Sequence, residues 1–122
     1  MPVASRVLIV EAEFLIGLEI QQILEENGAK QVQLFQNVID AAEDADLDVD
    51  VVLLEARLGA EEVLAFRTMM EERAIPVIMM TADRATAASF AGEAVLEKPF
   101  TAEGLVAVCQ IQPLRGRLQS SS

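Results

Sequence analysis

The sequence contains no histidine, tryptophan or tyrosine, and its only cysteine is Cys109. Without histidine the chain cannot build a His-based catalytic triad or the usual zinc site, and it cannot itself act as a phosphohistidine relay. Nucleobase stacking platforms are not expected without tryptophan and tyrosine. One cysteine excludes an internal disulfide and fits a reducing compartment, so we expect a cytoplasmic protein.

Basic residues are also scarce. Nine Lys and Arg stand against 20 Asp and Glu, which gives a net charge of −11. Phosphate contacts need clustered basic side chains, so we expect no nucleic-acid binding, whereas basic partners or divalent cations remain compatible. No apolar run approaches the ~18–20 residues of a membrane span, and the N-terminus lacks a signal-peptide pattern. We therefore expect no membrane association.

The chain does contain a regular alternation of short apolar runs and longer amphipathic stretches. The apolar runs predict strands at 6–10, 32–35, 51–54, 76–80 and 94–97. The stretches between them predict helices at 13–26, 37–46 and 60–73, with a last helix at 101–111. Residues 82–93 hold few large apolar groups, so the fourth helix should be short or irregular. This alternation predicts an α/β fold with a parallel sheet covered by helices on both faces.

Helical spacing of apolar residues indicates which side of each helix is buried. The first helix carries Leu15, Leu18, Ile23 and Leu24 at approximately helical spacing. The third helix carries Val63, Leu64, Phe66 and Met70, and the last begins at the capping residue Thr101. Cys109 falls within that helix and is expected in the core. We predict one domain at 1–112 and a flexible tail at 113–122.

Polar residues follow four of the predicted strands. Glu11, Glu55, Thr81 and Lys98 stand at or just after the ends of strands one, three, four and five. In an open parallel sheet, ligands collect at the carboxyl ends of the strands, so these side chains should converge on one cleft. Two carboxylates could hold Mg²⁺, and a hydroxyl beside a lysine would suit a phosphoryl oxygen.

Three segments carry a family resemblance: residues 7–13, residues 52–58, and residues 76–81 taken together with Lys98-Pro99-Phe100. From about Arg6 to Ile111 the chain resembles the receiver domain of two-component response regulators. The compact stretch 90–100 is similar to stand-alone receivers of alphaproteobacteria in which the fourth helix is reduced. The resemblance implies a doubly wound (βα)5 fold of the flavodoxin-like kind, with strand order 2-1-3-4-5.

The resemblance also implies roles for individual positions. Glu55 occupies the phosphoacceptor position, which receives a phosphoryl group from a kinase histidine in phosphorelay signal transduction. Glu11 falls at the first acidic position, and the backbone carbonyl of Arg57 falls where relatives complete a Mg²⁺ site. Thr81 and Lys98 match the residues that bind the phosphoryl oxygens. The bond between Lys98 and Pro99 is often cis in relatives.

Three positions depart from the family pattern. The phosphoacceptor position holds Glu55 rather than aspartate, and its extra methylene moves the carboxylate by ~1.5 Å. Misplacement on that scale can lower a rate ~10²-fold. Ala12 stands where relatives have a second, more direct metal-binding acid, so Mg²⁺ should bind weakly or not at all. Val95 replaces the aromatic ring that changes rotamer on activation in many relatives. We therefore expect inefficient phosphotransfer and no aromatic switching.

Several functions remain open at this point. The first is a phosphorylation-independent receiver without cofactor or enzymatic activity, in which Glu55 pairs with Lys98 and the domain binds a sensor histidine kinase or another signalling protein. The second is a working phosphoacceptor, in which Glu11, Glu13 and Glu55 improvise a metal site. An unrelated small enzyme is disfavoured, since the sequence has no Gly-rich phosphate loop and no obvious nucleophile.

Simpler structural roles compete with these functions. Glu55 could be only an ion-pair partner of Lys98, Thr81 a strand-end cap, and Glu13 an exposed acid in the first turn of a helix. We expect a monomer or a weak homodimer.

Overall fold

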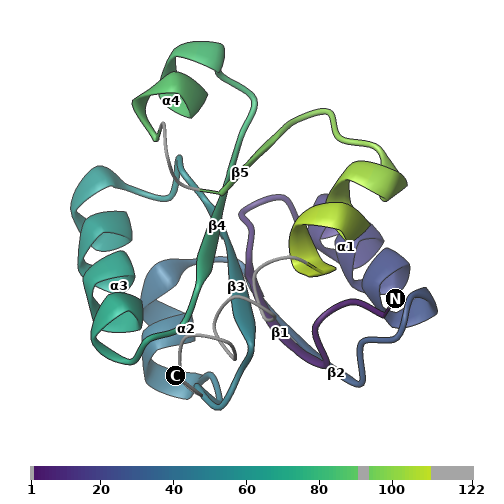
Figure 1. Ribbon diagram of the computed structural model, residues 1–122. Coiled ribbons are helices and arrows are strands. Elements are labelled where there is room, and N and C mark those ends of the chain that lie inside the picture. Colours follow the sequence, from purple (N-terminus) through teal and green to yellow (C-terminus); the bar gives the residue numbers. More distant parts are fainter. Residues whose placement is uncertain (1, 91–93, 111–122) are drawn as a thin grey trace, which may run out of the picture.

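Five parallel strands form one sheet in the computed structural model, which describes residues 2–90 and 94–110 (Figure 1). The strand order is β2-β1-β3-β4-β5, as the resemblance implied. The strands are β1 (Arg6–Val10), β2 (Gln31–Phe35), β3 (Val51–Glu55), β4 (Val77–Thr81) and β5 (Val95–Glu97). The α/β prediction and all five predicted strands are confirmed, with shifts of at most one residue at their ends.

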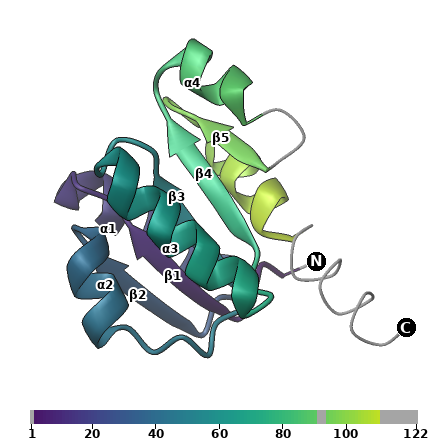
Figure 2. The ribbon, with the colours of Figure 1, turned by 90° about the vertical axis from the view of Figure 1, so that its left-hand side faces the viewer.

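Helices cover both faces of this sheet. They are α1 (Phe14–Glu26), α2 (Val38–Asp44), α3 (Ala60–Glu72) and α4 (Arg84–Ser89), and a further helix covers 102–110. Figures 1 and 2 show α2 and α3 on one face, and α1 with the 102–110 helix on the other. The fourth helix is short, as predicted. The predicted helix end at 111 and the predicted tail at 113–122 lie outside the described residues. No described helix is long and apolar enough to cross a membrane.

Strand β3 lies at the centre of the sheet, between β1 and β4. It pairs in register with both neighbours, for example Leu53 with Ile9 on one side and with Ile78 on the other. All five of its residues are buried. A strand covered by helices on both faces needs apolar side chains at successive positions, which explains the unbroken run before Glu55.

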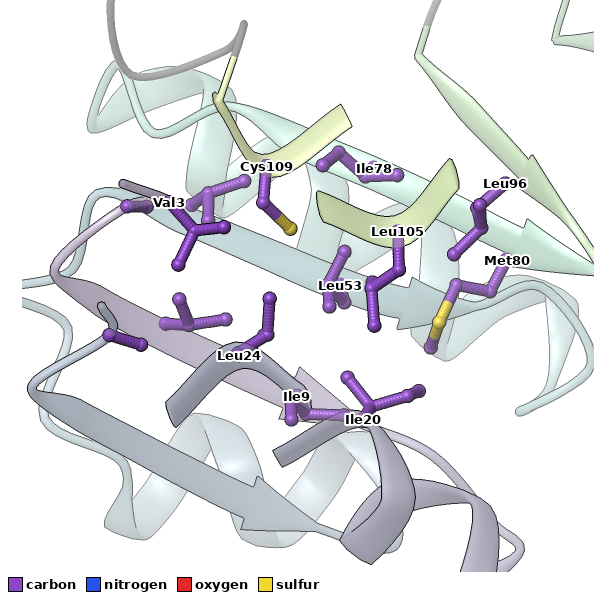
Figure 3. Packing of buried hydrophobic residues seen from close by; sticks show 14 residues of the cluster. Val3, Ile9, Ile20, Leu24, Leu53, Ile78, Met80, Leu96, Leu105 and Cys109 are labelled. Carbon is purple, nitrogen blue, oxygen red and sulfur yellow. The ribbon is translucent and has the colours of Figure 1, made fainter. Parts of the chain in front are cut away.

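Two apolar clusters hold the layers together, one on each face. The first packs α1 and the 102–110 helix on the sheet through residues that include Ile20, Leu24, Leu53, Leu105 and Cys109 (Figure 3). The second packs α2 and α3 on the other face through residues that include Val38, Leu54, Phe66, Met70 and Met79. The prediction that Cys109 is a core residue is confirmed.

The buried side of α1 differs from the predicted one. Leu15 and Leu18 are 80% and 40% exposed, while Gly17, Ile20 and Leu24 face the core. A Cβ on Gly17 would lie only 2.5 Å from Cδ1 of Leu34. The missing side chain thus lets this side of the helix approach β2 closely, which rotates the two leucines outward.

The buried side of α3 also differs from the prediction, at one residue. Leu64 is 63% exposed, whereas Val63, Phe66 and Met70 are buried as predicted. Residue 64 directly follows Val63, so a helix rotates it by about 100° away from the line that Val63 and Met70 share.

Asn37 caps the N-terminus of α2. The side-chain oxygen of Asn37 accepts the N–H of Asp40 at 2.8 Å, and the Asn37 amide donates to the Asp40 carboxylate at 2.9 Å. An asparagine cap of this kind contributes about 1 kcal/mol to helix stability. It also fixes the direction in which the chain leaves β2, beside the strand ends that carry the candidate site.

Candidate functional site

The structure brings together three of the four strand-end side chains by direct ion pairs. Lys98 Nζ donates to Glu11 Oε1, and it also lies 3.2 Å from Glu55 Oε1. We call Glu11, Glu55 and Lys98 the carboxylate–lysine cluster. Glu11 is fully buried, Glu55 is 7% exposed, and the Lys98 side chain is 11% exposed. These charges are therefore screened much less by solvent than a surface pair would be.

Backbone hydrogen bonds beyond the strand ends position the cluster. The N–H of Glu11 donates to the Phe35 carbonyl at 2.9 Å, which extends the β1–β2 pairing. The N–H of Lys98 donates to the Thr81 carbonyl at 2.8 Å, which extends the β4–β5 pairing. Glu55 is itself the last residue of β3. Each charged residue thus leaves the sheet at a fixed point and in a fixed direction.

All four carboxylate oxygens in the cluster accept N–H groups. Besides Lys98, the N–H of Ala12 donates to Glu55 Oε2 at 3.1 Å, and the N–H of Glu13 donates to Glu11 Oε2 at 3.1 Å. Among the described residues, no buried side-chain nitrogen or oxygen lacks a hydrogen-bond partner. The cluster is internally satisfied.

The two carboxylates titrate in opposite directions. Burial raises the pKa of Glu11, and this outweighs the hydrogen bonds from Lys98 and the Glu13 backbone. Burial also acts to raise the pKa of Glu55, but the hydrogen bond from the Ala12 backbone, together with the charge and hydrogen bond of Lys98, holds that pKa below its ordinary value. On acidification, Glu11 therefore takes up a proton before Glu55.

Lys98 is held in its charged form. Burial acts to lower its pKa, but the hydrogen bond and charge of Glu11, with the charge of Glu55, raise the pKa above the ordinary value. One ammonium between two carboxylates leaves one negative charge uncompensated when both acids are ionised. The cluster therefore attracts cations more readily than anions.

The sequence paired Lys98 with Glu55 alone, and the structure adds Glu11 as its other partner. A second residue that the sequence reasoning missed is Gln36, whose Nε2 donates to the Ala12 carbonyl at 3.2 Å. Gln36 directly follows β2, so the rule of polar residues at strand ends could have found it.

Thr81 lies at the same edge of the sheet, 2% exposed. Its hydroxyl accepts the N–H of Asp83 at 3.1 Å, and Asp83 in turn caps α4 through the N–H of Ala85. Pro99 follows Lys98 through a cis peptide bond. In the structure, Thr81 thus supports the turn into α4.

Three acids could in principle hold a metal ion. One oxygen each from Glu11, Glu13 and Glu55 lie within 4.8 Å of one another. Oxygen ligands of this kind suit Mg²⁺. Both oxygens of Glu11 and of Glu55 are already bonded to N–H groups, however, and the Lys98 ammonium forms ion pairs with both acids. The donor set has the right chemistry, but the arrangement fits an ammonium better than Mg²⁺.

Val95 begins β5 and is partly buried in the second apolar cluster. Phe90, at the end of α4, packs against the same cluster, and its ring lies 4.9 Å from the guanidinium carbon of Arg67. The cluster that contains Val95 thus receives an aromatic ring from the residue that directly follows α4.

Comparison with protein families matches residues 7–110 to the response regulator receiver domain. Among solved structures, the chain is similar to NtrX from Brucella abortus in complex with ADP, with 24% identity and a TM-score of 0.81 over 99% of this chain and 28% of that one. It is similar to the response regulator PhyR from Brucella abortus, with 25% identity and a TM-score of 0.78 over 98% and 52%. A response regulator receiver protein from Sinorhizobium medicae WSM419 gives 19% identity and a TM-score of 0.72 over 90% and 94%.

The chain thus spans little more than a quarter of NtrX and about half of PhyR. The comparison with curated proteins found no match.

Proposed function

This chain belongs to the response regulator receiver domain family, and we propose that it acts there as a phosphorylation-independent, protein-binding signalling module without catalytic activity. In this proposal Lys98 holds Glu11 and Glu55 together, as a permanent internal contact. The domain then presents one constant surface to its partner, which the family suggests is a sensor histidine kinase or another signalling protein.

The observation that carries this proposal is that the carboxylate oxygens of the cluster are all hydrogen-bonded. The carboxylate oxygens of Glu11 and Glu55 each accept an N–H group, including two contacts from Lys98. Phosphoryl transfer would require a free Glu55 oxygen to attack phosphorus, with a metal ion to neutralise the phosphoryl charge. Ala12 offers no carboxylate for that ion, and Lys98 occupies the space between the acids.

We propose that the partner binds next to the cluster, at α1. Phe14, Leu15 and Leu18 on α1 are 50%, 80% and 40% exposed. Ile16, which directly follows Leu15, lines a groove of about 360 Å³ together with Lys98, Pro99 and Phe100. Exposed apolar side chains next to a groove are typical of protein-binding sites. We assign this surface to the signalling partner, and expect Leu15→Asp to weaken that interaction about tenfold in a titration with the partner.

The direct test is incubation with acetyl phosphate and Mg²⁺, followed by intact-mass measurement. In a phosphorylated protein, a Glu55 oxygen would have attacked phosphorus and acetate would have left. We expect no adduct on the wild-type chain. A stable phosphoryl adduct on Glu55 would contradict the proposal.

The matched control is the double variant Ala12→Asp with Glu55→Asp, which restores both family acids. Ala12 is exposed, so a new carboxylate fits there without a packing penalty. Metal-dependent labelling of this variant beside an unlabelled wild type would locate the loss of phosphorylation in these two positions. An unlabelled variant would mean that the loss extends further into the pocket.

One observation favours a second candidate, a working phosphoacceptor with weakly bound Mg²⁺. The oxygens of Glu11, Glu13 and Glu55 are close enough to share one ion. That candidate requires Mg²⁺ to displace Lys98 Nζ. A magnesium titration followed by amide NMR would support it if residues around Glu13 and Lys98 shifted together at millimolar metal.

A further inference from the structure

An apolar groove lies between α2 and α3. Figures 1 and 2 show these two helices on the face of the sheet opposite α1 and the 102–110 helix. Its volume is about 320 Å³, at the lower end of the range for binding pockets. Its walls come from Val38, Ile39 and Ala42 on α2, and from Ala65, Phe66 and Met69 on α3. Ile39 is 59% exposed, and Ala42 and Ala65 are exposed too, so the groove opens to solvent.

The shape of the groove favours a helix. Ala42 and Ala65 keep the middle shallow and free of long side chains, which lets another backbone approach. Two parallel walls of apolar side chains, Ile39 on one and Met69 on the other, match the ridge that leucines at i, i+3, i+4 and i+7 form on an amphipathic helix. The shorter wall, α2, is 7 residues long, or about 10 Å, so the groove offers about two turns of contact.

The charged residues that line the groove indicate the charge of its partner. Glu43 and Glu62 line its two sides. No Lys or Arg occurs anywhere between Lys30 and Arg57, whereas α2 also carries Asp40 and Asp44. An apolar ridge flanked by lysines or arginines complements such a groove, because the basic groups meet the two glutamates while the ridge is buried.

From this combination we infer that the α2–α3 groove docks a cationic amphipathic helix of a partner protein. A second copy of this chain fits poorly, since each copy carries a net charge of −11 and would bring its own glutamates against those of the other. The groove is separate from the carboxylate–lysine cluster and from the exposed apolar residues of α1. The inference therefore holds whether or not Glu55 is phosphorylated.

The test uses a synthetic amphipathic peptide of about 16 residues, roughly 24 Å as a helix, with leucines at i, i+3, i+4 and i+7 and lysines on the flanks. It is titrated into the full ¹⁵N-labelled chain. We expect amide shifts concentrated at 38–43 and 62–69, and an affinity that falls as salt is raised. A scrambled peptide of the same composition has no apolar ridge and should bind at least about tenfold more weakly.

Two exposed apolar residues supply matched variants. Ile39→Asp places a charge in the groove and should weaken peptide binding about tenfold or more. Leu64→Asp introduces the same charge on α3 at a residue that is 63% exposed and does not line the groove, so it should leave the affinity nearly unchanged. Both side chains are exposed, so we expect each variant to keep its fold, which circular dichroism checks.

Several results would overturn the inference. These are the absence of binding, equal binding of the scrambled peptide, and shifts centred on α1. Shifts at 38–43 and 62–69 that grow with protein concentration alone would assign the groove to a second copy. The variant Arg115→Glu/Arg117→Glu tests the C-terminal segment of this chain as the occupant. If its spectrum without peptide differs from that of the wild type at 38–43 and 62–69, the groove is assigned to that segment.

Discussion

Replacing Lys98 with methionine removes the ammonium from the carboxylate–lysine cluster and keeps a side chain of similar length. The apolar stem that Lys98 packs along its surroundings is thereby preserved. What is lost is the pair of ionic hydrogen bonds to Glu11 and Glu55. Two buried carboxylates then face each other without a counter-charge.

The expected loss can be bounded from the structure. At an effective dielectric constant of about 20, unit charges at the 3.2 Å separation of Lys98 and Glu55 attract by about 5 kcal/mol, before the cost of desolvating the lysine is subtracted. In the variant, protonation of one carboxylate removes the repulsion between Glu11 and Glu55. Protonating an acid of ordinary pKa 4.5 at pH 7 costs about 3.4 kcal/mol. We therefore expect Lys98→Met to lower the free energy of unfolding by about 3 kcal/mol at pH 7.

The loss of stability in Lys98→Met should depend on pH. Glu11 already has a raised pKa in the wild type, and loss of Lys98 raises it further. As the pH falls from 7 toward 4.5, protonation becomes easier by about 1.4 kcal/mol per unit. The gap in stability between variant and wild type should shrink accordingly. Urea unfolding at pH 7, 6 and 5, with equal m-values for the two proteins, measures this gap.

Arg6→Met is the control, because Arg6 pairs with Asp48 at the surface, where the two side chains are 42% and 81% exposed. Loss of such a pair costs about 1 kcal/mol or less. A loss of under about 1 kcal/mol for Lys98→Met at pH 7 would show that the cluster behaves like that surface pair. An equal loss at pH 5 and pH 7 would contradict the protonation argument.

Four further outcomes follow from single residues. Gly17→Ala should destabilise the chain by about 1 kcal/mol, since overpacking against Leu34 outweighs the gain in helix propensity; a raised melting temperature would contradict this. Burial raises the pKa of Cys109 to about 12, so its thiol should resist an aromatic disulfide reagent at pH 8 until urea unfolds the chain, and rapid native labelling would disprove it. The lowered pKa of Glu55 means that its stabilisation is lost as the pH falls below 4.5, and Glu55→Gln should flatten that part of the stability profile. The raised pKa of Lys98 gives stability that is lost as the pH rises above 10.5, and this alkaline loss should be absent in Lys98→Met.

The sequence predicted much of the site because chain order and sheet geometry constrain it. Glu11, Glu55 and Lys98 each follow an apolar run, and parallel strands deliver their ends to one edge. The sequence did not predict that Lys98 bonds to Glu11 as well as Glu55, or that Gln36 binds the Ala12 carbonyl. Those contacts depend on side-chain directions and sub-ångström placement, which spacing along the chain does not encode.

The sequence also did not predict which face of α1 is buried. The spacing of Leu15 and Leu18 suggested a buried stripe in α1, but the close approach of Gly17 to Leu34 decided which stripe faces the sheet. That choice depends on how α1 packs against β2, which the spacing of apolar residues within α1 does not encode. It also created the exposed apolar surface that we assign to a partner.

The sequence alone predicted the order of elements, the buried central strand and the short fourth helix, and it shows that residue 12 carries no carboxylate, because each depends on local pattern or residue identity. Tertiary structure alone decided that one lysine satisfies two buried glutamates, and that α2 and α3 leave an acidic-edged apolar groove between them. Both features arise from residues that come together only after the sheet has formed. Their energies depend on burial and distance, which exist only in the folded chain.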